Sequence, residues 1–203
     1  MSYSEDIHEA LTSLQKGGVI LYPTDTIWGI GCDATDEAAV RRVFQVKQRD
    51  DSKALILLVG SIETLQQYVP FDEYPSDIIA TLYRYLQSGS NLPAKPTTII
   101  YPKVVNLPSF LQAQDGSVAI RLTHEVFSHD LCAALRKPLV STSANISGHP
   151  APQCFVEIDR QIRDAVDYVC SYRQDDSKPA QASTILRLYR QDNGQFAFAT
   201  IRR

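Results

Sequence analysis

The sequence predicts one α/β or α+β domain, and three observations lead to this expectation. Segments with helical spacing interleave with short apolar segments typical of strands. The length of 203 residues fits a single domain over 1–203. Hydrophobic residues make up 44% and charged residues 21% of the chain, which are ordinary globular values. This composition excludes disordered and fibrous classes.

The first elements follow from periodicity and from stop signals. Ile7, Leu11 and Leu14 recur at helical spacing before two glycines, which predicts a helix over about 5–16. A short apolar run over 19–22 predicts a buried strand that a proline ends. An acidic start at Asp36 then predicts a helix that ends near residue 47.

The later elements alternate in the same way. The fully apolar run 55–59 predicts a buried strand. Helices are expected at 61–68, 76–87 and 124–136, and strands at 97–101, 117–121, 139–142 and 166–172. The chain closes with a predicted hairpin of 183–190 and 195–202 around Asp192-Asn193-Gly194. The polar stretch 173–182 is expected to be a mobile surface loop.

Net charge and cysteine content restrict the cellular compartments and the classes of partner that fit this sequence. The net charge of −3 excludes a chain that is basic overall, although it leaves room for a local basic patch. The N-terminus lacks a signal-peptide pattern, and no apolar run approaches the roughly 20 residues of a membrane span. The four cysteines form no CxxC pair. We therefore expect reduced thiols in a cytoplasmic protein with no membrane partner.

The first candidate motif, residues 23–31, follows the first predicted strand. Two threonines, Thr24 and Thr26, flank an aspartate just before two glycines. Hydroxyls there can bind a polar substrate, and glycines allow close backbone approach. The alternative is a turn closed by side-chain bonds to its own backbone.

The second motif ends the second predicted helix. Lys47, Arg49 and Lys53 place three cations within seven residues. Arginine binds phosphate oxygens bidentately, and lysine acts as a compact point charge. The alternative is a solvated helix end whose cations complement the helix dipole.

A third motif, residues 139–148, carries hydroxyls and an amide after a strand. Ser141, Ser143 and Asn145 at such a strand end suit anion or nucleotide binding. Neither a Walker A loop nor a GxSxG elbow is present, and an ordinary Ser/Thr-rich loop is the alternative. Arg121 and Ser183 each lie in a predicted strand, where structural pairing is the default interpretation.

The chemistry indicated is that of hydroxyls and cations without an obvious nucleophile. His8, His124 and His129 fall on predicted helix faces, where solvent exposure is expected. A Ser-His-Asp hydrolase is possible on composition, but no residue has the sequence context of a catalytic nucleophile. Such a set suits phosphoryl or nucleotidyl transfer, in which positioning and charge stabilisation do the work.

Together the motifs resemble a known family. Pro-Thr-Asp-Thr-x-x-x-Gly, Lys-x-Arg, Ser-Thr-Ser-Ala-Asn-x-Ser-Gly and Ala-Ser-Thr-Ile-Leu occur in the order found in the YrdC family, over about residues 8–203. Members with this layout are threonylcarbamoyl-AMP synthases, and the chain resembles their short form without an extra C-terminal domain. The resemblance implies a twisted, open, mixed sheet flanked by helices, with a concave, positively lined cavity.

The resemblance also implies a reaction and partners. L-Threonine, bicarbonate and ATP, the last with Mg²⁺, would give threonylcarbamoyl-AMP and pyrophosphate. A separate transferase complex would then modify adenosine 37 of ANN-decoding tRNAs, and direct tRNA binding is a further expectation. The alternative is an RNA-binding YrdC-like module without synthase activity. The hydrogenase-maturation carbamoyltransferases share the fold, but they are long chains with zinc fingers that this sequence lacks.

Residue roles follow from the matching motifs. The resemblance implies a threonine site made by Thr24, Thr26, Arg121, Ser141 and Ser183. It implies an ATP site made by Arg49, Lys53, Ser143, Asn145 and Arg202, with Lys47 and Arg49 as catalytic cations and no metal ligand from the protein. Gln48, Asp50 and Ala54 depart from the glycine and prolines found in many members. Many members also have a histidine near residue 58, where this chain has leucine.

Overall fold

The computed structural model describes residues 1–48, 55–87, 95–176 and 182–203. The helices are α1 (Tyr3–Gln15), α2 (Glu37–Val46), α3 (Ile62–Gln66), α4 (Ser76–Gln87), α5 (Val126–Leu135) and α6 (Arg160–Ala165). The strands are β1 (Ile20–Tyr22), β2 (Gly29–Gly31), β3 (Ile56–Val59), β4 (Thr97–Tyr101), β5 (Val118–Leu122), β6 (Leu139–Ser143), β7 (Tyr168–Val169), β8 (Thr184–Arg190) and β9 (Phe196–Arg202). Short 3₁₀ turns occupy Phe71–Glu73, Ser109–Leu111 and Phe155–Glu157.

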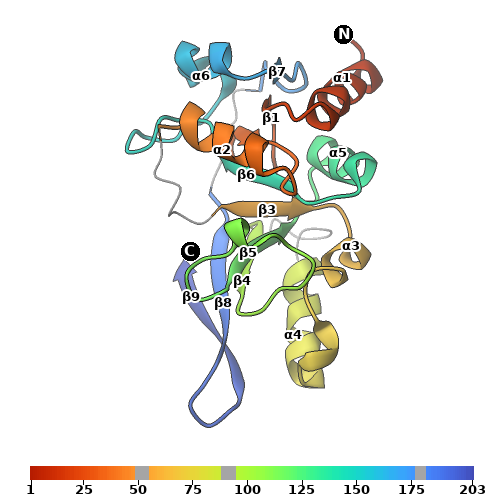
Figure 1. Ribbon diagram of the computed structural model, residues 1–203, viewed down its shortest axis with the longest axis vertical. Coiled ribbons are helices and arrows are strands. Elements are labelled where there is room, and N and C mark those ends of the chain that lie inside the picture. Colours follow the sequence, from red (N-terminus) through yellow and green to blue (C-terminus); the bar gives the residue numbers. More distant parts are fainter. Residues whose placement is uncertain (49–54, 88–94, 177–181) are drawn as a thin grey trace.

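The described strands form one mixed, open sheet in the order β7-β1-β2-β6-β3-β5-β4-β8-β9 (Figure 1). The pairs β1–β7, β3–β5 and β4–β8 are parallel, and the other neighbouring pairs are antiparallel. The predicted mixed sheet flanked by helices is therefore confirmed. The predicted closing hairpin is also present, with Gly194 in the left-handed region at φ 83°.

Helix starts agree with local capping chemistry. Ser2 and Glu5 form a capping box, so α1 begins two residues before the predicted start. Asp36 caps α2 as expected, since its side chain accepts a bond from the Ala39 amide at 3.1 Å. The predicted start at residue 124 was wrong, because Glu125 caps α5 and the helix begins at Val126.

Strand β2 lies inside the motif 23–31, where no strand was predicted. Gly29 and Gly31 pair with β1 on one side, and Gly29 pairs with β6 on the other. The Tyr22 hydroxyl reaches the Val140 carbonyl oxygen at 3.0 Å. A Cβ on Gly31 would lie 2.2 Å from that oxygen and 2.7 Å from the Tyr22 ring. Only glycine leaves this space, and glycine's low strand propensity concealed the strand in the sequence.

The segment after the fifth helix also differs from prediction. Helix α6 was not predicted, and the strand expected over 166–172 shortens to two residues. The buried carboxylate of Asp6 accepts bonds from the Ser171 and Tyr172 amides at 3.0 and 2.7 Å. These amides are thereby withdrawn from the sheet, which ends β7 early.

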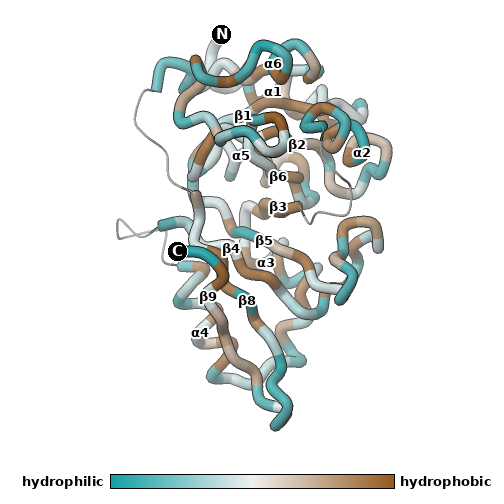
Figure 2. The backbone as a smooth tube through the Cα atoms, turned by 90° about the vertical axis from the view of Figure 1, so that its left-hand side faces the viewer, coloured by the Kyte–Doolittle hydropathy of each residue, from teal (hydrophilic) through white to brown (hydrophobic). Residues whose placement is uncertain are grey.

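Two cores lie on opposite faces of the sheet. On one face, α2, α3, α4 and α6 cover the side chains of Leu21, Leu57, Ile99 and their neighbours. On the other face, α1 and α5 cover a smaller core around Tyr22 and Leu58. Figure 2 shows the hydrophobic central strands β3 and β6 and the hydrophilic tip of the β8–β9 hairpin. No helix in the described part of the chain has the length and apolar character needed to cross a membrane.

The face that carries α1 and α5 is only partly covered. Strand register aligns Ser141, Ile56, Ala119 and Ile100 in one row across β6, β3, β5 and β4. Next to it, Leu139 and Leu58 pack under α5, and Arg121 continues their row. Because the helices stop at this second row, the first row is left open to form a cavity.

Candidate substrate-binding site

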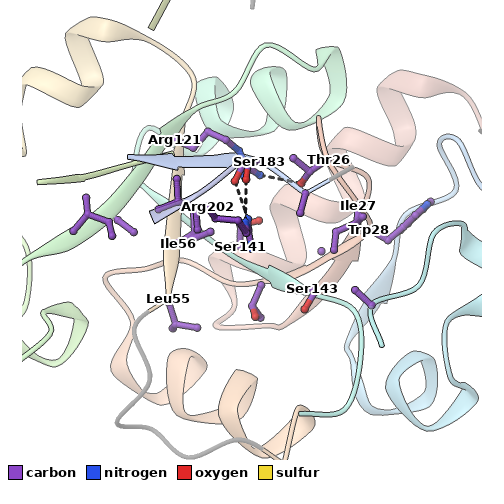
Figure 3. A pocket seen from close by; sticks show the side chains of 17 residues that line it. Thr26, Ile27, Trp28, Leu55, Ile56, Arg121, Ser141, Ser143, Ser183 and Arg202 are labelled. Carbon is purple, nitrogen blue, oxygen red and sulfur yellow. Dashed lines mark hydrogen bonds between the residues drawn. The ribbon is translucent and has the colours of Figure 1, made fainter. Parts of the chain in front are cut away.

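A cavity of about 440 Å³ opens on this uncovered part of the sheet (Figure 3). Its floor is the row Ser141, Ile56, Ala119 and Ile100, and its walls include Thr26, Trp28, Ser143, Ser183 and Arg202. Six of the predicted site residues line it, namely Thr26, Arg121, Ser141, Ser143, Ser183 and Arg202. Of the others, Thr24, Lys47 and Asn145 are not part of the lining, and Arg49 and Lys53 fall outside the described residues.

Arg121 presents its guanidinium to the cavity from β5. The side chain is 3% exposed, and its Nε lies 3.1 Å from Asp25 Oδ1 without hydrogen-bond geometry. Its terminal nitrogens make only long bonds, 3.5 Å to Thr98 Oγ1 and 3.4 Å to Thr26 Oγ1. Since charge-assisted bonds are normally shorter than 3 Å, these donors have capacity for an anionic ligand.

A second guanidinium faces the same space. Arg202 donates from Nε to the Ser183 carbonyl at 3.1 Å and from Nη2 to Ser183 Oγ at 3.2 Å. Burial and, second, the charge of Arg121 lower the pKa of Arg202. The two cations therefore oppose one another, and an anion placed between them would relieve that repulsion.

Thr98 and Asp25, neither of them among the predicted site residues, complete this end of the cavity. Buried Thr98 shares a 2.9 Å bond between its hydroxyl and Ser183 Oγ, which links the two arginines. Burial raises the pKa of Asp25, while the neighbouring Arg121 opposes that rise. Asp25 stood in the predicted motif, but its pairing across the fold had no local signal, and neither did the hydroxyl of a residue in strand β4.

Residues 24–27, which we call the threonine turn, form a closed turn and also supply a hydroxyl to the cavity. Thr24 Oγ1 donates to the Ile27 carbonyl at 2.7 Å and accepts from the Thr26 amide at 3.0 Å. The two threonine hydroxyls are themselves 3.0 Å apart. Thr24 thus closes the turn from behind, and Thr26 presents its hydroxyl to the cavity.

The loop after β6 rests on a buried lysine. Lys47 is 2% exposed, and its ammonium donates to the Ser143 carbonyl, to the Asn145 carbonyl at 2.7 Å and to Asn145 Oδ1 at 3.4 Å. The interpretation of Lys47 as part of a solvated helix end is therefore wrong. Asn145 Nδ2 donates to the Ile146 and His149 carbonyls at 3.0 and 2.7 Å, so this side chain organises the loop.

Trp28 forms an aromatic wall that the sequence did not identify. It is the single tryptophan of the chain, it is 6% exposed, and its ring packs 4.9 Å from that of Phe155. No spacing rule marks a cavity-lining aromatic residue inside a turn. Its position makes tryptophan fluorescence a direct reporter of ligand binding.

The histidines named above lie on the surface, and the described residues contain no candidate metal site. His8 and His129 are exposed on helices as expected, and His124 is exposed before α5, with Nε2 2.8 Å from the Leu86 carbonyl oxygen. The described part of the chain contains no group of three or more His, Cys, Asp or Glu side chains able to hold a metal ion. The charged side chains in the described cavity lining are the two arginines.

Fold and cavity together define a class: an α/β protein that can bind a small anionic substrate on the open face of a mixed sheet. The Sua5/YciO/YrdC family, described as telomere recombination, matches residues 12–201. The chain belongs to this family.

Similar proteins extend over most of the chain. A threonylcarbamoyl-AMP synthase of Klebsiella pneumoniae is 35% identical over 89% of this chain and 93% of its own length. The crystal structure of Escherichia coli YciO matches the fold with a TM-score of 0.78 at 21% identity, over 100% of this chain and 90% of that one. A P. abyssi Sua5 variant (H234A/Y235A) matches with a TM-score of 0.76 at 25% identity, over 92% of this chain. Here the match spans 54% of the Sua5 chain, about half its length.

Proposed function

We propose that this protein is a cytoplasmic L-threonylcarbamoyladenylate synthase that condenses L-threonine, bicarbonate or CO₂, and ATP. The observation that carries the proposal is the convergence of Arg121 with the Thr26 and Ser183 hydroxyls on one cavity, which Arg202 also lines. This set matches an amino acid that carries both a carboxylate and a hydroxyl. The naming of similar proteins as threonylcarbamoyl-AMP synthases supports the same reaction.

Threonine would bind at the Arg121 end of the cavity. The guanidinium of Arg121 would pair with the substrate carboxylate, and Thr26 and Ser183 would bond its polar groups. Ser141 would lie beside the substrate on the cavity floor, while Thr24 supports Thr26 from behind.

ATP, as its Mg²⁺ complex, would bind toward the loop after β6. Ser143 and Arg202 would contact the nucleotide, and Asn145 would set the shape of the loop. Arg49 and Lys53 are proposed as phosphate ligands from the segment that follows α2. The charge of Lys47 lies directly behind Ser143, where it would favour the phosphates without leaving its carbonyl partners.

The chemistry requires positioned reactants and screened charge. The threonine amine takes up CO₂ and releases a proton, which gives N-carboxythreonine. The new carboxylate oxygen attacks the α-phosphorus in line, the α–β bridging bond breaks, and pyrophosphate leaves with the electron pair. Both reactants are anions, so Arg121, Arg202 and Arg49 supply the charge stabilisation that the transition state needs. No covalent intermediate with the enzyme is formed.

The product is a mixed anhydride that water destroys, so we propose that it passes to a tRNA threonylcarbamoyltransferase complex. That complex would transfer the threonylcarbamoyl group to adenosine 37 of ANN-decoding tRNAs. Direct contact of this chain with tRNA is part of the same proposal.

One incubation tests the proposed function. The protein is mixed with ATP, Mg²⁺, labelled bicarbonate and L-threonine, each omitted in turn, and the labelled adenylate is followed by mass and radioactivity. We expect threonylcarbamoyl-AMP and pyrophosphate in equal amounts, and neither when any substrate is absent. RNA binding without threonine-dependent pyrophosphate release would instead identify an RNA-binding module and reject the synthase.

A further inference from the structure

Arg173 has a backbone conformation that its residue type disfavours. Its φ is 62°, in the left-handed region that favours glycine. A non-glycine residue there costs about 1 kcal/mol or more. Such a conformation persists where the surroundings hold it in place, and the contacts of this side chain do so.

The guanidinium of Arg173 joins three separate segments. Nη1 donates to the Thr24 carbonyl at 3.2 Å and lies 3.5 Å from Glu125 Oε1. Nε and Nη2 both reach Asp176 Oδ2, at 3.2 and 2.9 Å. The loop after β7, the start of α5 and the threonine turn are thereby held by one side chain.

Both ends of this link are themselves fixed. Glu125 caps α5 through the Ser128 amide at 2.8 Å. On the other side, Asp6 holds the Tyr172 amide at 2.7 Å, and the Tyr172 ring stacks on Phe127 at 5.4 Å. Arg173 therefore extends from a rigid base, which an arginine on a free loop would not have.

The threonine turn lies between two arginines. The bonds made by Thr24 Oγ1 are internal and do not fix the turn relative to the sheet. Arg121 holds it from the cavity side, through Asp25 and Thr26. Arg173 holds it from the opposite side, through the Thr24 carbonyl.

We infer that Arg173 is a positioning residue for the substrate-amino-acid end of the cavity. It fixes the turn so that the Thr26 hydroxyl stays beside Arg121, and it does not itself line the cavity. This inference rests on the proposed function, since it assigns Arg173 to the site where threonine is proposed to bind.

Arg173→Gly tests the inference because it removes the side-chain contacts while the backbone can keep its left-handed conformation. Glycine accepts the left-handed conformation without strain and removes the whole side chain, the guanidinium included. The matched control is Arg136→Gly, because Arg136 also has a left-handed φ, 57°, but is exposed at the far end of α5. Arg173→Lys retains the charge without the fork that reaches three segments at once.

We expect Arg173→Gly to raise KM for L-threonine about tenfold, with KM for ATP and kcat within twofold of the wild type. Arg136→Gly should leave all three constants unchanged, and Arg173→Lys should fall between. A wild-type KM for threonine in an active Arg173→Gly protein would overturn the inference. Equal increases in both KM values would also overturn it, because they would indicate general structural loss.

Amide hydrogen exchange supplies a readout that does not depend on synthase activity. Peptides covering residues 23–31 should exchange several times faster in Arg173→Gly than in the wild type or in Arg136→Gly. Unchanged exchange in this peptide would reject the positioning role. An inactive wild type with the expected exchange pattern would reject the proposed function while retaining the link between Arg173 and the turn.

Discussion

The two ends of the cavity are built in different ways. At the Arg121 end, side chains from strands and a turn face the cavity with long, weak bonds to one another. At the Ser143 end, Lys47 is not part of the lining, and its ammonium already has three acceptors from the loop. Both ends hold a buried cation, but only Arg121 faces the cavity with its donors engaged in long bonds.

This difference indicates that Arg121 acts in ligand binding and that Lys47 supports the structure of a loop. Strand register places Arg121 and Ser141 without help from a ligand, so losing the Arg121 fork should mainly cost binding and rate. Lys47 fixes the shape of the loop by donating to the Ser143 and Asn145 carbonyls, the first of which also accepts from the Asn145 amide. Losing Lys47 should therefore cost stability as well as activity.

The largest effect on catalysis is expected at Arg121. Arg121→Lys keeps the charge but loses the planar fork, so kcat/KM for threonine should fall about 10²-fold. Pyrophosphate release as a function of threonine concentration measures this. Arg187→Lys, an arginine on β8 paired with Asp115, is the control and should retain wild-type turnover. A fall in kcat/KM of less than threefold in Arg121→Lys would show that this end of the cavity does not bind threonine.

The largest effect on stability is expected at Lys47. Lys47→Met should lower the free energy of unfolding by about 3 kcal/mol, because the charge-assisted bonds of a buried ammonium to the Ser143 and Asn145 carbonyls are lost. Urea denaturation measures this. Lys137→Met is the matched control, since Lys137 is half exposed in its pair with Asp33 and should cost under about 1 kcal/mol. Equal costs for the two variants would erase the contrast between the ends of the cavity.

A pair of serines on one strand sharpens the comparison. Ser141→Ala should raise KM for threonine and Ser143→Ala should raise KM for ATP, each by up to about tenfold, the scale of one lost hydrogen bond. Steady-state kinetics with one substrate varied at a time distinguishes them. The assignment fails if both variants shift the same KM.

The smallest effect concerns the pH dependence of stability. Burial raises the pKa of Asp25 above its ordinary value of 3.8, so the folded protein holds this proton more tightly than the unfolded chain. The stability that this protonated carboxyl contributes is complete at pH values below its ordinary pKa, and it is lost as the pH rises through the pKa of the folded protein. Denaturation from pH 3.5 to 7 gives the free energy of unfolding of the wild type and of Asp25→Asn. The difference between the two, wild type minus variant, should decline across this range by about 1.4 kcal/mol for each unit by which folding raises the pKa of Asp25. Parallel curves would contradict this.

Sequence reasoning predicted most of the fold because periodicity is local. The helices near residues 5–16 and 76–87, the strand at 55–59 and the closing hairpin all follow from spacing and turn residues. Strand β2 was missed because the glycine at 31 is required by the Val140 carbonyl and the Tyr22 ring, which approach it across neighbouring strands. A contact across strands leaves no periodic signal.

The site shows the same limit. Motif order brought Thr26, Arg121, Ser141, Ser143, Ser183 and Arg202 into the prediction, and all six line one cavity. Thr98 and Arg173 act through partners 85 and 149 positions away in the chain, and no local pattern encodes such partners. The sequence likewise could not reveal that Lys47 lies buried behind its loop, since burial depends on where β6 returns.

Binding to a charge-neutral pair variant tests the central claim most directly. In Asp25→Asn/Arg121→Met both partners of the buried pair lose their charge together, so no carboxylate is left without its cation. L-Threonine and ATP are titrated separately against the fluorescence of Trp28, with thermal denaturation as the check on folding. We predict that the folded variant loses threonine binding by at least 10²-fold and keeps its ATP affinity within twofold. Threonine affinity equal to that of the wild type would contradict the account.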